Sequence, residues 1–504
     1  MQDAAAASPV GEDLQPGVNL AGFFRSENGL GEAARLLAAA VQGSGLAYTT
    51  RTYTRSPSRQ GAPFTDRGDG VARYDVNLLA INGDGIVNFA ADTGPAFFDR
   101  RYTIGAWAWE TDRIPDRWAG SLEIVDEIWM PSDFSRAAVE AVTAKPTFTF
   151  PHPILVPPEP GVGRAAVGLP EGFTFLFAFD FFSRAERKNP WGLVEAFRRA
   201  FPQPGQASLV LKTVNGRNRA LELERLRAVT GGRTDIRIVD EYMTADRLRA
   251  MIGLCDCYVS LHRAEGFALT LAEAMAQARP VIATGYSGNL TFMTEANSYL
   301  CGYHLVPVGD EAGFYSGSGR WADPDVEEAA RLMRHVFEHR EEAAARGALA
   351  LKDVRRYHSL QARAGLLRRQ LDWVRENRLP SCRVWGNDWA GASPALRAEL
   401  QLVRDPMLDL PTRTGGAYGA LARLARRAFR RLYMPYQLHA EEAGRAQVEA
   451  LWRQVIETER LRRRIEALEA ADGVEAPGDP TAADAGRVAR PGSARSSEAA
   501  PREP

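Results

Sequence analysis

A regular alternation of short apolar runs with amphipathic stretches constrains the fold of this chain more than any other feature. Such alternation is typical of repeated βα units, in which parallel strands form a sheet and helices cover its faces. The units come in two blocks, and the Pro- and Gly-rich segment 156–172 between them resists both a helix and a central strand. The sequence therefore predicts an α/β chain with two Rossmann-like domains that face each other across a cleft and are joined by a hinge.

The two blocks span residues 17–155 and 173–380. Ligands of such folds bind beyond the carboxyl ends of the strands, so the loops that follow the strands are where a site is expected. The predicted strands of the first block are 17–24, 75–82, 102–109, 127–131 and 147–154, and those of the second are 174–181, 208–213, 235–240, 257–261 and 280–284.

The flanks of the two blocks differ from them in composition. Residues 1–16 and 471–504 carry almost no large apolar side chains, so they cannot offset their ordering entropy and are expected to be disordered. Residues 381–470 are predicted to be an irregular linker followed by helices. Of these helices, 420–434 is basic and amphipathic, which suits either an anionic membrane surface or packing on the protein. The last helix, about 440–470, could pair with another copy of the chain.

Composition narrows the class of protein further. The 504 residues are 45% hydrophobic and 25% charged, which is ordinary for a soluble globular protein. Lysine and arginine (62) balance aspartate and glutamate (63), so the chain as a whole is not built to coat nucleic acid. Four cysteines make no disulfide framework, the first residues lack a signal-peptide pattern, and no apolar run approaches the roughly 20 residues of a membrane span. We therefore expect a cytoplasmic protein.

The most informative segment is 260–284, which predicts a buried strand, a short glycine loop and a helix whose first turn lies at 266–269. The free N–H groups and positive dipole end of such a helix would seat a diphosphate. Glu265 precedes the predicted helix and Glu273 lies two turns inside it, so both carboxylates should lie along one face. Carboxylates accept paired hydroxyl hydrogen bonds, as in ribose recognition, although two glutamates at this spacing are more often solvated surface residues.

The whole segment resembles the family 4 retaining glycosyltransferases, whose hallmark is two glutamates in an E-x(7)-E pattern. The resemblance extends over roughly residues 17–375 and implies the GT-B fold, with a helical extension at its C-terminal end. Two glycines of the family pattern are replaced here, by Ala268 and Ala278. The matching residues are Arg263, Glu265, Gly266, Phe267, Leu269, Glu273, Ala274, Met275, Ala276 and Pro280 through Thr284.

The resemblance implies how the donor would be held. Lys188 matches a family lysine that grips the donor diphosphate, whereas the usual arginine position is Ser183, for which Arg184 or Arg187 would substitute. Glu265 would face the transferred sugar and Glu273 the nucleoside, and the loop around Glu241 and Tyr242 would hold a base that the sequence does not identify. The predicted donor-binding residues are Glu273, Gly266, Phe267, Ala268, Leu269, Arg263, Arg187, Lys212, Gly288, Asn289, Gly29 and Gly31.

The first block is expected to contribute two features. A glycine loop, Asn28–Arg35, opens a helix directly after a strand, and in the resembled family this loop closes over the sugar and phosphate. Many family members also place a histidine near the cleft, but the corresponding position here is Glu110. Glu110 would orient or deprotonate the acceptor hydroxyl, or else cap a Trp-anchored core strand. The predicted catalytic residues are thus Glu265, Lys188 and Glu110.

These residues predict a retaining, metal-independent glycosyltransferase. No Cys or His cluster has metal-ligand spacing, so we expect no metal, and the nucleotide diphosphate sugar is a co-substrate rather than a cofactor. The resemblance suggests a saccharide or lipid-linked saccharide acceptor in bacterial cell-surface polysaccharide biosynthesis, at the inner face of the membrane. Three alternatives stay open: a catalytically inactive GT-B scaffold in a polysaccharide assembly complex, a sugar-nucleotide epimerase, and a phosphorylase with lysine-bound pyridoxal phosphate.

Overall fold

A computed structural model describes residues 14–403, apart from 57, 310, 311, 313, 314, 316 and 318, together with 448, 451, 452, 454–458, 461, 462 and 464. The predicted basic helix 420–434, the tail 471–504 and residues 1–13 of the first tail lie outside the described residues. The chain divides into two compact units, Met1–Arg453 and Gln454–Pro504, and both sheets lie in the first. Every described residue of 448–464 is helical.

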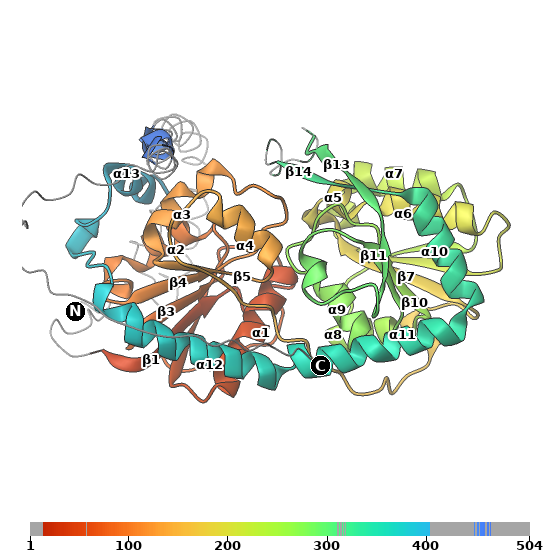
Figure 1. Ribbon diagram of the computed structural model, residues 1–504, viewed down its shortest axis with the longest axis horizontal. Helices are drawn as coiled ribbons and strands as arrows, with labels where there is room; N and C mark the ends of the chain where they lie inside the picture. The colour runs from red at the N-terminus through yellow and green to blue at the C-terminus, as the bar shows by residue number, and fades with distance from the viewer. Residues whose placement is uncertain are drawn as a thin grey trace, which may run out of the picture. The chain divides into compact units, whose positions relative to one another are not determined.

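The first domain is built on a six-stranded parallel sheet with the order β2-β1-β3-β4-β5-β6 (Figure 1). All five predicted strands are present, and the first begins at Gln15, two residues inside the predicted tail. The sixth, β2, was not predicted because its sequence YTTRT is largely polar, as an edge strand tolerates. The strands are β1 Gln15–Gly22, β2 Tyr48–Thr52, β3 Tyr74–Ala80, β4 Tyr102–Ala106, β5 Glu127–Met130 and β6 Thr147–Thr149.

The second domain repeats the architecture with the order β12-β11-β10-β7-β8-β9, again all parallel. The two α/β domains and the GT-B layout predicted from the sequence are therefore confirmed, and the boundaries at 155, 172 and 380 stay predictions. The strands are β7 Thr174–Asp180, β8 Ser208–Val214, β9 Ile236–Asp240, β10 Cys257–Ser260, β11 Val281–Thr284 and β12 Tyr299–Cys301.

Helices cover both sheets, as βα connectivity requires. Those of the first domain are α1 Gly29–Gly43, α2 Ile86–Thr93, α3 Ala119–Ile124 and α4 Asp133–Glu140. Those of the second are α5 Ala185–Lys188, α6 Pro190–Ala200, α7 Ala220–Thr230, α8 Ala245–Leu254, α9 Leu269–Met275, α10 Val326–Glu338 and α11 Arg340–Asp353. No helix in the part of the chain that the structure describes is long and apolar enough to cross a membrane.

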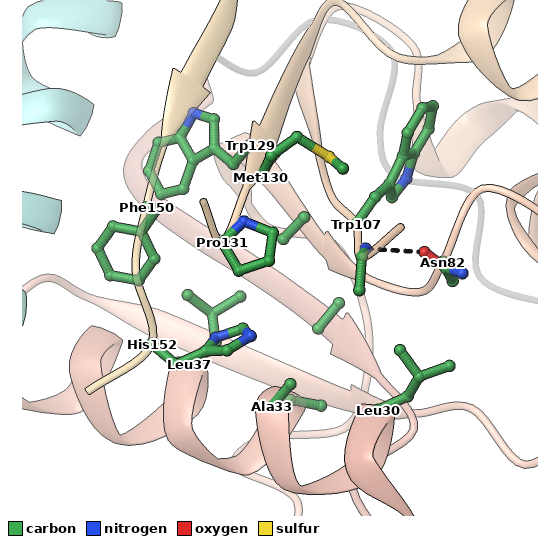
Figure 2. Close-up of a pocket in the computed structure, with 14 residues that line it drawn as sticks. Leu30, Ala33, Leu37, Asn82, Trp107, Trp129, Met130, Pro131, Phe150 and His152 are labelled. Carbon is green, nitrogen blue, oxygen red and sulfur yellow. Dashed lines mark hydrogen bonds between the residues drawn. The ribbon is translucent and has the colours of Figure 1, made fainter. Parts of the chain in front are cut away.

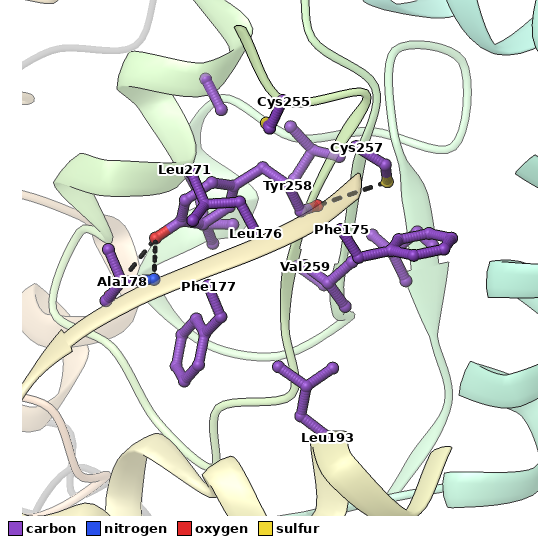
Figure 3. Close-up of a cluster of buried hydrophobic side chains, with 14 of the residues drawn as sticks. Phe175, Leu176, Phe177, Ala178, Leu193, Cys255, Cys257, Tyr258, Val259 and Leu271 are labelled. Carbon is purple, nitrogen blue, oxygen red and sulfur yellow. Dashed lines mark hydrogen bonds between the residues drawn. The ribbon is translucent and has the colours of Figure 1, made fainter. Parts of the chain in front are cut away.

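The interior of the second domain is dominated by aromatic and aliphatic side chains of its central strands (Figure 3). Tyr258 of β10 is fully buried, and its hydroxyl is hydrogen-bonded to both the N–H and the carbonyl of Ala178 on β7. Cys255 and Cys257 are also fully buried, and burial raises the pKa of the Cys255 thiol to about 12. These two thiols are therefore core residues.

After the second domain the chain returns to the first (Figure 1). Helix α12 Leu360–Asn377 packs on α1 and places Leu367, Leu371 and Val374 in the core beneath β1 and β3. The chain then forms α13 Pro394–Val403, which packs on α2 and α3. The prediction of an irregular linker at the start of 381–470 was therefore wrong over α13, because the apolar face of this helix is recognisable only against its partners.

A hairpin from the second domain makes a further connection. Strands β13 Tyr303–Pro307 and β14 Arg320–Pro324 pair antiparallel, and residues at and between them enter the core of the first domain. Tyr315 and Trp321 pack there with Trp109, and Tyr315 lies 5.2 Å from Trp109 between ring centroids. The two domains therefore share one apolar cluster.

Ala268 and Ala278, where the family pattern has glycine, both have positive φ, +72° and +56°. Ala278 follows α9 in the left-handed conformation, and the hydrogen bonds Arg279 N–H to Ala274 O and Ala278 N–H to Met275 O close the helix end. A left-handed alanine costs roughly 1–2 kcal/mol because its Cβ crowds the following carbonyl. Both positions thus have the backbone geometry that glycine adopts without strain.

We predict that Ala278→Gly stabilises the protein by roughly 0.5–1 kcal/mol, since removal of the strained Cβ outweighs the entropy that glycine adds to the unfolded chain. Urea unfolding of wild type and variant measures the difference. The matched control is Ala276→Gly, two residues earlier, where φ is −63° and the methyl group is buried. That change should destabilise the protein, and equal effects at both positions would contradict the strain argument.

Candidate active site

Three loops at the carboxyl edge of the second sheet form one connected layer. They follow β7, β10 and β11. These three strands are neighbours in the sheet, in the order β11-β10-β7, although β7 lies well before the other two in the chain. The N–H of Arg263 donates to Arg187 O at 2.7 Å, and the N–H of Gly288 donates to Glu265 O at 2.9 Å. The Ser287 hydroxyl accepts from the N–H of Glu265 at 2.8 Å. The segment 263–265 is therefore held from both neighbouring loops, at Arg263 by the loop after β7 and at Glu265 by the loop after β11.

Glu265 is buried between two cations. Its exposed fraction is 7%, Oε2 lies 3.1 Å from Arg187 Nη1, and Oε1 contacts Lys188 Nζ. Burial by itself would raise the pKa of Glu265, but the positive charges of Lys188 and Arg187 outweigh it and lower the pKa to about 2. Glu265 is therefore a permanent carboxylate at neutral pH, and Lys188 is the cation closest to it.

The Arg187 side chain makes its contacts within the protein. Its guanidinium donates to Ser183 O at 3.2 Å and to Ala264 O at 2.8 Å, in addition to the ion pair with Glu265. With an exposed fraction of 4%, it holds the Glu265 loop in place, and its role toward a donor diphosphate stays a prediction. Arg184, the other candidate to replace the family arginine, has a strained φ of +66°, a geometry that often marks functional sites.

Glu110 comes from the first domain to the same charge network. The predicted strand 102–109 ends at Ala106, so Glu110 lies in the following loop rather than at the strand end. The Tyr315 hydroxyl donates to Glu110 Oε2 at 2.8 Å, and Arg187 Nη2 lies 3.9 Å from Oε1. Tyr315 was missed from the sequence because it lies beyond the family pattern, in the hairpin loop.

Helix α9 starts later than predicted. It begins at Leu269, with the left-handed Ala268 as its N-cap, so the prediction of a first turn at 266–269 was wrong. Residues 265–268 form a loop instead, and Glu265 and Glu273 do not lie on one helix face. The loop packs on the first domain: the hydroxyls of Ser132 and Ser135 donate to Gly266 O at 2.8 and 3.3 Å. Phe267 contacts the His152 ring, with 5.0 Å between centroids.

Glu273 has a separate environment. It lines a pocket of about 400 Å³ between α1, α8, α9 and the segment 153–157, together with Glu32 and Arg249. Burial raises the pKa of Glu273 to about 7, the charge of Glu32 adds to the rise, and Arg249 opposes it. Glu273 is thus partly protonated at neutral pH, unlike Glu265.

Other residues predicted to bind the donor make structural contacts. Arg263 pairs with Asp323 of β14 at 3.0 Å and anchors the hairpin. Lys212 is buried and donates to Thr213 O and Glu241 O, and burial lowers its pKa to about 8. It therefore holds the loop predicted to carry the base.

Of the remaining glycine and asparagine residues predicted to bind the donor, three have structural contacts and one, Gly29, has open space around it. The N–H of Gly288 is occupied by Glu265 O, and the Asn289 side chain is buried between His262 and Thr284 O. A Cβ on Gly31 would lie 2.0 Å from Ser26 O, so a close turn requires this glycine, whereas Gly29 has open space around it.

Comparison with known proteins agrees with this fold. Residues 173–320 match the family model described as Glycosyl transferases group 1. The structure is similar to that of Alr3699/HepE from Anabaena, solved in complex with UDP and glucose, with a TM-score of 0.51 and 13% identity over 72% of this chain and 100% of that one. Sucrose-phosphate synthase from Thermosynechococcus elongatus is similar to the same degree, with a TM-score of 0.51 and 16% identity over 71% and 100%. No curated protein sequence matches the chain.

The class of protein follows from the fold and this match: the chain has the GT-B fold of glycosyltransferases. More particularly, residues 173–320 of its second domain match the model of glycosyl transferases group 1. The resemblance predicted from the E-x(7)-E segment is thereby confirmed. Within the described ranges, no group of three His, Cys, Asp or Glu side chains could hold a metal ion, and metal independence stays a prediction.

The raised pKa of Glu273 predicts a pH-dependent stability. The folded protein keeps this carboxyl protonated up to about pH 7, whereas the unfolded chain ionises near its ordinary value of 4.5. Stability therefore falls as pH rises from 4.5 to 7, since the folded state binds more protons. We expect Glu273→Gln to match wild type below pH 4.5 and to be progressively more stable above it.

Urea unfolding from pH 4 to 8 measures this difference. Glu32→Gln should reproduce part of it by removing a repelling charge. The matched control is Glu341→Gln, an exposed glutamate in α11, which should leave the pH dependence unchanged. A Glu273→Gln curve parallel to wild type throughout would show that this carboxyl ionises normally.

Proposed function

We propose that the chain is a retaining glycosyltransferase that moves a sugar from a UDP-sugar to an acceptor hydroxyl. The observation that carries the proposal is the buried ion pair of Glu265 with Lys188, within the segment that matches the glycosyl transferase group 1 model. Support for uridine as the base comes from the Anabaena neighbour, which was solved with UDP and glucose. The resemblance to family 4 enzymes supports retention of configuration and a role in cell-surface polysaccharide biosynthesis.

Lys188 is proposed to stabilise the leaving diphosphate. Its ammonium group is largely buried, and burial lowers its pKa while Glu265 counteracts this by favouring the charged form. A preorganised cation in a site with little water interacts strongly with charge that develops on the leaving oxygen. When a donor binds, its diphosphate would share Lys188 with Glu265.

Glu265 is proposed to accept hydrogen bonds from hydroxyls of the transferred sugar. A carboxyl group with a pKa of about 2 does not supply a proton near neutral pH, so it serves here as an oriented anion rather than a general acid. Arg187 and Ser287 fix its position. The proton of the acceptor hydroxyl would pass to the leaving phosphate during attack on the same face of the sugar, as the family resemblance implies.

Glu273 is proposed to bind the ribose hydroxyls. It lies in a pocket formed with the first domain, and its other charged neighbours there are Glu32 and Arg249. Glu110 is proposed to orient the acceptor hydroxyl, because it reaches the network of Arg187 from the first domain. These roles divide the site into a nucleoside end at Glu273 and a reacting end at Glu265, Lys188 and Glu110.

Donor binding is tested first by thermal shift with UDP, UDP-glucose, UDP-N-acetylglucosamine and the corresponding GDP and ADP compounds. A ligand at 100 times its Kd adds about 2.7 kcal/mol of stability. Stabilisation by the uridine compounds alone supports the proposal, and no stabilisation by any compound favours the inactive-scaffold alternative. Consumption of the donor without an acceptor, with release of an epimer, would favour the epimerase alternative.

We predict that Lys188→Ala lowers turnover about 100-fold or more, by analogy with the loss of one preorganised donor at a developing charge. Binding of UDP should weaken more than binding of UMP if Lys188 reaches the distal phosphate. The control is Lys352→Ala, an exposed lysine of α11, which should keep wild-type turnover. Equal losses of UDP and UMP binding would place Lys188 away from the diphosphate.

For Glu273→Ala, measured above pH 7 where this carboxyl is mostly ionised, the expected result is weaker UDP binding by roughly 1.5–3 kcal/mol, since a charged hydrogen-bond partner of the ribose is lost. Inorganic pyrophosphate, which has no ribose, should bind wild type and variant alike. Calorimetry with both ligands makes the comparison. If Glu273→Ala binds UDP as tightly as wild type does, Glu273 does not bind the ribose.

A further inference from the structure

The first domain contains a pocket of about 450 Å³ that none of the proposed donor roles uses (Figure 2). It lies where β3, β4 and β5 end, opposite the first turns of α1. In Figure 2, Leu30, Ala33 and Leu37 of α1 lie on one side, and Trp129, Met130 and Phe150 lie on the other.

The lining of this pocket is apolar. Alanine, leucine, methionine and aromatic side chains make up most of it, and its polar side chains apart from the two indoles are Asn82 and His152. Asn82 Oδ1 already accepts from the N–H of Ala108 at 2.9 Å, and the Trp129 indole donates to Glu127 at 2.7 Å. A saccharide here would lose water from several hydroxyls without replacement partners, which is costly, whereas an apolar group would gain.

His152 supplies unused hydrogen-bonding capacity in this wall. Its Nδ1 is buried and has no hydrogen-bond partner among the described residues. The same holds for Nε1 of Trp107, but that indole packs against Trp118, with 5.4 Å between ring centroids. Burial lowers the pKa of His152 to about 4, so the ring is neutral and offers one donor and one acceptor nitrogen. Buried polar groups are normally paired, so an unpaired ring in a pocket wall suits a ligand with a single hydroxyl.

The pocket adjoins the reacting end of the proposed site. The His152 ring packs edge-on against Phe267, two residues from Glu265. Ala108 of the lining precedes Glu110 by two residues, and Leu30 lies between Gly29 and Gly31 of the glycine loop. A molecule in the pocket would therefore have its polar end near the donor-binding loop.

We propose that this pocket binds the apolar body of the acceptor, an aryl or branched-alkyl alcohol, with its hydroxyl hydrogen-bonded to His152. The inference rests on the proposed function and names its acceptor class. In the transfer, the acceptor oxygen forms a bond to the anomeric carbon and the bond from that carbon to the diphosphate oxygen breaks. The electron pair of the broken bond leaves with UDP, which also takes the proton of the acceptor hydroxyl. His152 positions the hydroxyl and does not take up the proton.

The test compares three probes by ligand-observed NMR titration: 2-naphthylmethanol, 2-methylnaphthalene, which lacks the hydroxyl, and maltose, which lacks an apolar body. Ala33→Phe should fill the pocket and weaken binding of both naphthyl probes at least 10-fold. The matched control is Ala39→Phe, a partly buried alanine of the same helix outside the lining, which should leave binding unchanged. His152→Phe keeps a ring in place and should weaken 2-naphthylmethanol at least five-fold while 2-methylnaphthalene binds as before.

UDP binding is measured on the same samples, so that the two proposals fail separately. If UDP binds but 2-naphthylmethanol does not, or if Ala33→Phe binds it as well as wild type, the acceptor inference is overturned and the donor proposal stands. Binding of maltose that Ala33→Phe abolishes would also overturn it, since the pocket would then be a saccharide site. If naphthyl binding follows the expected pattern but no UDP binds, the proposed function fails instead. An equal effect of His152→Phe on both naphthyl probes would show that the hydroxyl of the probe does not bond to His152.

Discussion

The rest of the site depends on one buried carboxylate between two cations. Glu265 is removed from water, and an isolated charge there would be very costly, so its position requires Lys188 and Arg187 together. Arg187 in turn requires the carbonyls of Ser183 and Ala264, which belong to different loops. The ion pair thus ties the loop after β7 to the loop after β10, and the geometry of each depends on the other.

The same charges extend into the first domain. Glu110 approaches Arg187 and is held by Tyr315, whose hairpin packs into the aromatic cluster of the first domain. Ser132 and Ser135 bond the carbonyl of Gly266, where an added Cβ would lie 3.1 Å from Trp109 O. Close backbone approach explains the glycine, and the contact brings the two domains together beside Glu265.

The two sides of this contact differ in chemistry. On the second domain the loops present a carboxylate and cations, which suits a charged donor. On the first domain the pocket beside His152 is lined by apolar side chains and offers few free polar atoms. Burial acts on both sides in the same direction, because it disfavours charge: His152 stays neutral, whereas Glu265 stays charged only through its partners.

The sequence by itself determined the two α/β domains, ten of their twelve sheet strands and the loops on which the site residues lie, because periodicity and strand-end position are local properties of the chain. It also placed Glu265 and Lys188 in one site, because the family resemblance covers both, in two separate segments of the chain. It did not show β2, β12 or α13, whose polar or short sequences form regular structure only against neighbours.

Tertiary structure decided the rest, because pairing, burial and pKa depend on residues far apart in the chain. It separated Glu265 from Glu273 by starting α9 at Leu269, so one carboxylate is held ionised by cations and the other is raised toward neutrality by burial and Glu32. It assigned Arg187 to Glu265, although the sequence offers Arg184 as an equal alternative. It also gave His152 a place in a pocket wall, which its Pro-His-Pro context does not indicate.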